Sequence, residues 1–176
     1  VVIDYETNEL GNGEWNAGLR TTWTSDDGKV RVGATAITDK GDAARTNLGA
    51  VDVRLRLGTS TEVRAEAALS RGDGKSATAL SGEVEHHTGP IDLLAYVHQV
   101  EDGFGVGQQN LAERGRRKIG ADARVSLTDK LSLVGSAWRD ESLTDDALRN
   151  AIELRAAWRS KSTDAYLGVA HLDDRL

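Results

Sequence analysis

The chain contains no cysteine and no methionine, and only one proline and one phenylalanine among its 176 residues. Without cysteine there is neither a disulfide framework nor a thiolate metal site. Large apolar side chains are scarce as well, because the 39% of apolar residues are mostly Ala, Val and Leu. We therefore expect the apolar surface to serve a purpose other than filling a thick globular core.

Several functional classes lack support in the sequence. No apolar run approaches the ~20 residues that a membrane-spanning helix needs. The formal net charge of −6 argues against a nucleic-acid binder, since there is no dominant basic field. No Ser stands in a nucleophile elbow, the acidic residues are scattered, and His86 and His87 point to opposite faces of a strand. We expect no enzymatic activity, no metal site and no cofactor.

The two ends of the sequence suggest a piece of a longer protein. The chain opens on Val1–Tyr5 without the charged and apolar regions of a signal peptide, and it closes on Leu172–Leu176, which reads as a strand running into a loop. We expect one domain over residues 1–176. Within it, residues 1–13 should form a lead-in strand or loop and residues 14–176 a β-meander.

Apolar and polar residues alternate along most of the chain, which is the period of a β-strand. The alternation is clean in segments 15–23, 30–36, 51–57, 63–69 and 119–127. It is weaker in segments 79–87, 91–100, 131–138 and 165–172. Residues 143–160 fit a strand or an amphipathic helix, and their neighbours favour a strand. The sequence predicts an all-β antiparallel meander of about ten strands.

Short and long connections alternate between these segments. The short ones lie at 25–28, 58–61, 88–90, 128–130 and 160–163, and the long ones at 38–46, 71–76, 101–116 and 139–149. Short periplasmic turns, longer outer loops and strands of about 9–13 residues are typical of outer-membrane barrels. We therefore predict that the chain forms part or all of a transmembrane β-barrel in the outer membrane of a Gram-negative bacterium.

Tryptophan and tyrosine residues mark candidate aromatic girdles. Trp15 and Trp23 are eight residues apart on one face of the first segment, which is about 20 Å along the membrane normal and close to the spacing of two girdles. Trp158 and Tyr166, which flank a short turn, are expected to join Trp23 in the lower girdle. The alternative is that these aromatics cover the ends of a soluble sheet.

Charges of both signs occupy the polar faces. Aligning the apolar faces across the turn at 58–61 predicts Arg54 opposite Glu66 and Arg56 opposite Arg64. These charges either select permeating solutes in a lumen or brace the interior as an ion-pair network, and the mixed signs favour the second interpretation. The lumen-facing candidates are Arg54, Arg56, Arg64, Glu66, Glu83, Glu85, Asp122 and Arg124.

Three further features have a structural and a functional interpretation. Trp138 is expected to face inward and cover Gly120, with ligand stacking as the alternative. The glycine-rich stretch 103–107 lacks the strand and helix context of a nucleotide-binding loop and is interpreted as a flexible external loop. A basic run follows it and would either contact anionic lipopolysaccharide or be ordinarily solvated. This run comprises Arg114, Arg116, Arg117 and Lys118.

Several stretches resemble the barrel regions of very large outer-membrane proteins of alphaproteobacteria, in which a barrel is attached to long repeat-rich portions. They are Asp39–Asp42, Glu62–Glu66, Val106–Asn110 and Gly115–Asp122. The resemblance implies an outer-membrane location and no catalytic residues. Outer-membrane barrels commonly end in an aromatic residue, and Leu176 departs from this pattern, as expected of an incomplete chain.

The predicted function is a pore or the membrane anchor of a larger surface protein. The expected partners are outer-membrane lipid, lipopolysaccharide and other domains of the same chain. The alternative is a soluble or surface-exposed all-β binding module that packs its apolar face on another sheet or on a partner chain.

Overall fold

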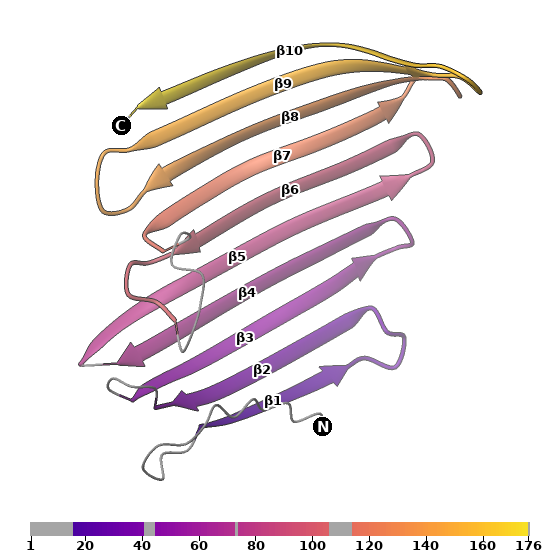
Figure 1. Cartoon of the computed structure of the whole chain (residues 1–176). Helices are drawn as coiled ribbons and strands as arrows, with labels where there is room; N and C mark the ends of the chain where they lie inside the picture. Colours follow the sequence, from indigo (N-terminus) through magenta and orange to yellow (C-terminus); the bar gives the residue numbers. More distant parts are fainter. Residues whose placement is uncertain (1–15, 41–44, 73, 106–113, 176) are drawn as a thin grey trace.

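The structure, a computed structural model, describes residues 16–40, 45–72, 74–105 and 114–175, which form one antiparallel sheet with its strands in chain order (Figure 1). The strands are β1 (Ala17–Thr24), β2 (Val30–Asp39), β3 (Thr46–Leu57), β4 (Thr61–Gly72), β5 (Lys75–Thr88), β6 (Ile91–Val100), β7 (Arg116–Ser126), β8 (Leu131–Ser142), β9 (Leu148–Arg159) and β10 (Asp164–Arg175). The predicted all-β meander is confirmed, and the ambiguous stretch 143–160 contains strand β9. None of the described residues belongs to a helix long and apolar enough to cross a membrane.

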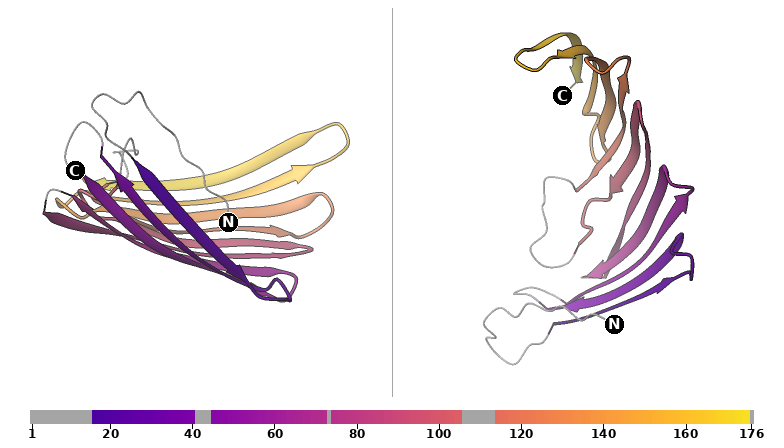
Figure 2. Two further views of the ribbon diagram at one scale, coloured as in Figure 1. Left: turned by 90° about the horizontal axis from the view of Figure 1, so that it is seen from below. Right: turned by 90° about the vertical axis from the view of Figure 1, so that its right-hand side faces the viewer.

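The sheet is curved into an open arc with β1 at one end and β10 at the other (Figure 2). The described residues 101–105, which follow β6, leave the sheet toward the hollow side of this arc. Among them, Phe104 packs in a cluster with Leu48 and Ala77. These two residues share a side of the sheet with Asp52 and Arg54, because residues two apart in a strand point the same way. The charged side of the sheet is therefore its concave face.

The convex side carries the apolar residues, and we call it the apolar face. Residues that are register partners from strand to strand form rows across it; in one such row Val53 pairs with Ala65, and Val97 pairs with Ile119. Large side chains on this face remain exposed, for example Val51 at 58% and Leu80 at 49%. The hydrophobic effect that they would contribute to folding is thus unrealised within this sheet.

The connections depart from strict alternation at two hairpins. A long connection was expected at 139–149, but only residues 143–147 lie between β8 and β9, as many as lie between β1 and β2, so this expectation is wrong. A longer loop was expected at 71–76, but β4 continues to Gly72 and β5 begins at Lys75, so this expectation is wrong. Gly74 has a φ of 72° in the connecting turn, a conformation that a two-residue hairpin turn favours. The longest connection does lie between β6 and β7, as expected.

The turn between β1 and β2 is fixed by local hydrogen bonds. The Ser25 hydroxyl donates to Oδ1 of Asp27 at 2.6 Å, and the backbone N–H of Lys29 donates to the same oxygen at 3.1 Å. These donors, the Ser25 hydroxyl first, lower the pKa of Asp27 to about 2. The turn therefore keeps its charged acceptor throughout the neutral pH range.

Gly120 in β7 lies beneath two aromatic residues of the neighbouring strands. It pairs with Trp138 in β8, as predicted, and with Tyr96 in β6. A Cβ atom at this position would collide with the Tyr96 ring and would lie 3.0 Å from Cβ of Trp138. Only glycine leaves room for both rings to lie over the sheet.

Replacing Gly120 by alanine is expected to lower the free energy of unfolding by about 1–3 kcal/mol, because the added methyl group overpacks against the Tyr96 ring and Cβ of Trp138. Gly49→Ala is the matched control, since a Cβ atom there would meet nothing within 4 Å. Urea unfolding of the detergent-folded protein, followed by Trp fluorescence, measures both variants. Equal stabilities would contradict this packing.

Candidate functional site: the charged concave face

Glu62 is the centre of the charge network on the concave face. Nη2 of Arg54 lies 2.6 Å from its Oε2, and Nε of Arg56 donates to the same oxygen at 3.2 Å. Nε of Arg64 donates to Oε1 at 2.7 Å. The Glu62 side chain is only 15% exposed, so three guanidinium groups compensate one largely covered carboxylate. We call Glu62 and these three arginines the Glu62 cluster.

The network continues from the Glu62 cluster onto β5 and β6. Arg64 reaches Oε2 of Glu83 through Nη1 and Oε2 of Glu85 through Nη2, both at 3.3 Å. Glu83 in turn lies 3.2 Å from Nε2 of His98. The chain therefore places charges of both signs across three strands, β3 to β5, as the sequence suggested for Glu83 and Glu85, and His98 of β6 borders them.

The predicted register between β3 and β4 is wrong by two residues. Arg54 pairs with Arg64 instead of Glu66, and Arg56 pairs with Glu62 instead of Arg64. The turn is tighter than expected, since β4 begins at Thr61 directly after a three-residue connection. A slip of two residues keeps every side chain on its own face, so the faces were predicted correctly although the partners were not.

A second ion pair lies beside the Glu62 cluster. Nη2 of Arg20 donates to Oδ2 of Asp52 at 2.7 Å, and the pair crosses above Gly33, where a Cβ atom would collide with Asp52. Together with Arg31 and Glu66 these residues line a depression of about 360 Å³ on the concave face. The sequence analysis missed Arg20, Asp52 and Glu62, although the alternation of their strands would have placed them on this face.

The remaining lumen-facing candidates share the concave face but lie away from the Glu62 cluster. Asp122 pairs with Leu94 and Ser136. Arg124 pairs with Asp92 and Val134. The described residues contain no group of three or more His, Asp or Glu side chains suited to hold a metal ion.

The segment Glu101–Gly105 folds back onto the concave face. Phe104 is only 8% exposed within its cluster. The backbone N–H of Gly105 donates to Oγ of Ser70 at 3.1 Å, and Oε2 of Glu101 accepts from the N–H of Thr78 at 2.7 Å. The prediction of a flexible external loop is therefore wrong for Phe104 and Gly105, which are buried, whereas Gly103 is exposed. Residues 106 and 107 lie outside the described part of the chain.

The apolar face ends in polar side chains on the side of the longer connections. The first polar residue of each strand on this side forms what we call the polar boundary. Its members, from β2 to β10, are Thr38, Asn47, Arg71, Thr78, Gln99, Arg117, Arg139, Asn150 and His171.

The polar boundary follows one row across β2–β4, where Thr38, Asn47 and Arg71 are register partners. From β4 to β10 it crosses the rows in steps of two residues, always in the same direction. Tracing register partners strand by strand from His171 in β10 leads to Val30 in β2. Val30 lies eight residues from Thr38, the boundary residue of that strand. The boundary therefore shifts by eight residues over eight strand spacings, or one residue per strand on average.

Two of the four aromatic girdle candidates share a level on the apolar face. Trp23 lies near the end of β1, and its row reaches Asn150 in β9. Trp158 is eight residues beyond Asn150, so the two Trp residues are at one level when the slope of the polar boundary is followed.

Tyr166 pairs with Ala157 and lies on the concave face, 5.9 Å from the Arg155 guanidinium. Its assignment to the same girdle is wrong, because Trp158 pairs with Ala165. Trp15 lies outside the described residues.

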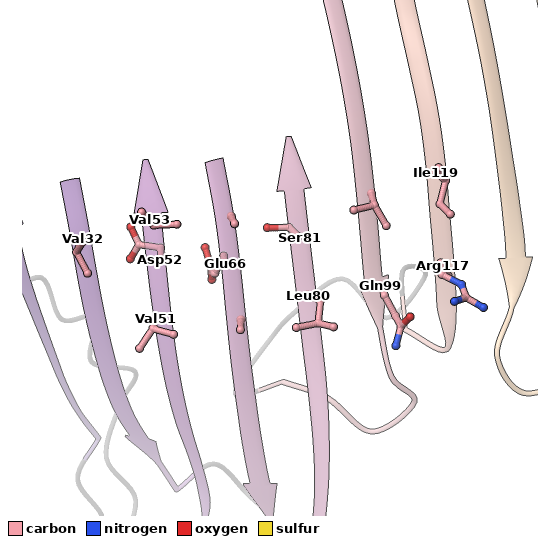
Figure 3. Close-up of a pocket in the computed structure, with 13 residues that line it drawn as sticks. Val32, Val51, Asp52, Val53, Glu66, Leu80, Ser81, Gln99, Arg117 and Ile119 are labelled. Atoms are coloured by element: carbon pink, nitrogen blue, oxygen red, sulfur yellow. The ribbon is translucent and has the colours of Figure 1, made fainter. Parts of the chain in front are cut away.

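Two rows of the apolar face enclose a shallow trough of about 580 Å³ (Figure 3). Figure 3 shows Val32 of β2 at one end and Arg117 and Ile119 of β7 at the other. The floor includes the small residues Ala65 and Ala67. The trough is therefore apolar along its length and polar at its β7 end.

Two solved structures have the same fold over most of this chain. Pseudomonas aeruginosa OccK9 (OpdG) has a TM-score of 0.53 at 14% identity, over 93% of this chain and 51% of that one. The outer membrane protein opdK from Pseudomonas aeruginosa has a TM-score of 0.54 at 10% identity, over 90% of this chain and 52% of that one. The chain thus spans about half the length of these proteins. No family model matches the sequence, and no curated protein is significantly similar to it.

These comparisons confirm the predicted fold class, an antiparallel meander of the outer-membrane β-barrel type. At such low identity the likeness concerns the fold alone. The resemblance to alphaproteobacterial proteins stays a prediction, because both matched structures come from Pseudomonas.

The position of Glu62 among three arginines predicts a large effect of removing its charge. Glu62→Gln should lower the free energy of unfolding by about 1–3 kcal/mol, since it weakens several charge-assisted hydrogen bonds at once. Glu66→Gln, on the same face and strand but outside the Glu62 cluster, is the control. The urea midpoint in detergent measures both, and an equal loss would show that the cluster has no special role.

Proposed function

We propose that this sheet is part of the wall of a β-barrel in a bacterial outer membrane, and that its concave face lines a water-filled pore. The observation that carries the proposal is the net slope of the polar boundary, which averages one residue per strand across β2–β10. The chain's structural neighbours support the same class of barrel.

A flat membrane explains this slope quantitatively. One residue along a strand spans ~3.3 Å and neighbouring strands are ~4.8 Å apart, so one residue per strand corresponds to strands tilted by about 35° from the normal of a flat layer. Strands of transmembrane barrels tilt by about 35–45°. A second packed sheet would cover a patch of its own outline and would impose no such net slope in one direction from β2 to β10.

The positions of Trp23 and Trp158 along the membrane normal agree with the same flat membrane. Trp23 and Trp158 lie at one level on the side of the shorter turns, where an aromatic girdle at the periplasmic interface is expected. The two residues are eight strand spacings apart in the sheet, so their agreement is a non-local observation.

The concave face has the properties of a pore lining. It carries the Glu62 cluster and the Arg20–Asp52 pair, which water or further charges must solvate. The segment Glu101–Gly105 lies over part of it and would narrow the passage. In this proposal the mixed charges mainly brace the wall, and the residual donors and acceptors contact permeating solutes.

The proposal includes further strands that complete the barrel. Among the described residues, β1 and β10 each pair with one neighbour only, and in lipid an unpaired strand edge is too costly to persist. The matched proteins are about twice as long as this chain. In this proposal the chain is one portion of a larger outer-membrane protein.

Single-cysteine labelling tests which face meets water, and the absence of cysteine makes every engineered thiol unique. In protein located in the outer membrane, Ser81→Cys and Ser136→Cys on the concave face should react with a membrane-impermeant maleimide. Ala65→Cys and Ala121→Cys on the apolar face should be at least about tenfold slower, because lipid excludes the charged reagent. Equal labelling of the two pairs, or folding of the chain as a soluble monomer in buffer, would contradict the proposal.

Conductance distinguishes a pore from a membrane anchor. The full-length protein in a planar bilayer should conduct ions, and reaction of Ser81→Cys with a bulky charged thiol reagent should reduce the current. The same reagent should leave the current of Ala121→Cys unchanged, since that residue faces away from the passage. A protein that labels as expected but does not conduct would be an anchor, and the pore would be disproved.

A further inference from the structure

The polar boundary contains a compact arginine pair on the lipid-facing side of β7 and β8. Nε of Arg117 donates to Oε1 of Glu141 at 2.6 Å, and Nη2 of Arg139 lies 3.1 Å from Oε2 of the same residue. Glu141 is 20% exposed, whereas Arg117 is 42% and Arg139 56% exposed. The covered carboxylate thus holds two guanidinium groups side by side, each with donors left over, and the group carries one net positive charge. We call these three residues the arginine clamp.

The basic run that precedes β7 is divided between the two faces by strand alternation. Arg117 joins the apolar face, because it pairs with Gln99 and Glu141. Arg116 pairs with Val100 and Ser142 on the concave face, and its Nε donates to Asp140. Of the basic run, only Arg117 belongs to the clamp; its other two members, Arg139 and Glu141, come from the next strand.

The apolar trough leads from the middle of the apolar band to this clamp. Its row of Val32, Val53, Ala65, Val97 and Ile119 continues to Arg139 in β8. Toward β8 this row also comes closer to the polar boundary, because the boundary crosses the rows. At its β2 end the trough lies six residues from the boundary, which is about 16 Å along the membrane normal. That depth is close to half of the ~30 Å hydrocarbon thickness, the length of one leaflet's acyl chains.

From this arrangement we infer that the trough and the arginine clamp bind lipopolysaccharide, with an acyl chain in the trough and a lipid phosphate on Arg117 and Arg139. The inference rests on the proposed outer-membrane location, in which the longer connections face outward and the clamp meets the outer leaflet. Arginine pairs suit this ligand because their planar forks bind phosphate oxygens with two hydrogen bonds each. The only charged side chain that the trough itself presents is that of Arg117 at its β7 end. Asp52 and Glu66 also line it, but their side chains point to the concave face.

The test compares matched variants of the full-length protein purified in detergent, titrated with purified lipopolysaccharide. The double variant Arg117→Gln/Arg139→Gln should bind it at least about tenfold more weakly, since two charge-assisted contacts are lost. Arg71→Gln, which removes a cation from the same polar boundary outside the clamp, should change the affinity less than about twofold. Equal effects of the two variants, or no effect of either, would overturn the inference.

A second pair of variants tests the trough. Ala67→Leu fills its floor and should weaken binding several-fold, whereas Ala121→Leu adds the same apolar volume to the same face outside the trough and should not. Phosphatidylglycerol is the competing anionic probe. If it displaces lipopolysaccharide at equal concentration, the site is a general anionic-lipid site and the assignment to lipopolysaccharide is overturned.

Cysteine labelling keeps failure of this inference separate from failure of the proposed function. If the concave and apolar positions label as expected in membranes and the clamp variants bind normally, only the lipid site is disproved. If the labelling pattern itself fails, the outer-membrane barrel is disproved and the lipid site with it.

Discussion

Backbone hydrogen bonding and a flat apolar layer place two different constraints on the same sheet. The hydrogen bonds fix the register between strands, since each strand in lipid must satisfy its polar groups with its neighbours. The layer fixes the level at which side chains turn from apolar to polar. Because the strands are tilted, both constraints are met only if the level at which side chains turn polar shifts, on average, by the same amount from strand to strand. The shift from Thr38 in β2 to His171 in β10 fulfils this requirement, and the levels of the tryptophans and the position of the arginine clamp follow from it.

The same two constraints explain why the charged side chains of this acidic chain are divided so sharply between the two faces of the sheet. Below the polar boundary, charged residues of the described strands lie on the concave face, where Glu62 is held by three arginines from two strands. Pairing of opposite charges across strands lets many charges share one wall without a strong field of one sign. A bracing network and a pore lining are therefore compatible, since each ion pair leaves donors and acceptors that water or a solute can use.

Within each strand, sequence alternation was sufficient to divide the side chains between two faces, and it gave the number of strands, because both are local properties. It was insufficient for the partners of Arg54 and Arg56, because a register slip of two residues changes no face. Tyr166 was placed on the wrong face because the parity across the turn at 160–163 depends on its geometry. The burial of Phe104 could not be predicted for a different reason, because it depends on Leu48 and Ala77, which belong to two other strands. The arginine clamp also joins residues from two strands, so no contiguous motif marks it.

The open edges of the sheet are the remaining consequence of the hydrogen-bonding constraint. Strands β1 and β10 run in opposite directions in the antiparallel order, so an even number of additional strands is needed to close the meander with antiparallel pairs throughout. The slope adds a second condition, because the stagger of a closed barrel is the sum of the shifts between its strands. At one residue per strand, that total is close to the number of strands. The strands that pair with these edges must therefore be even in number, and their polar boundary must continue the same shift.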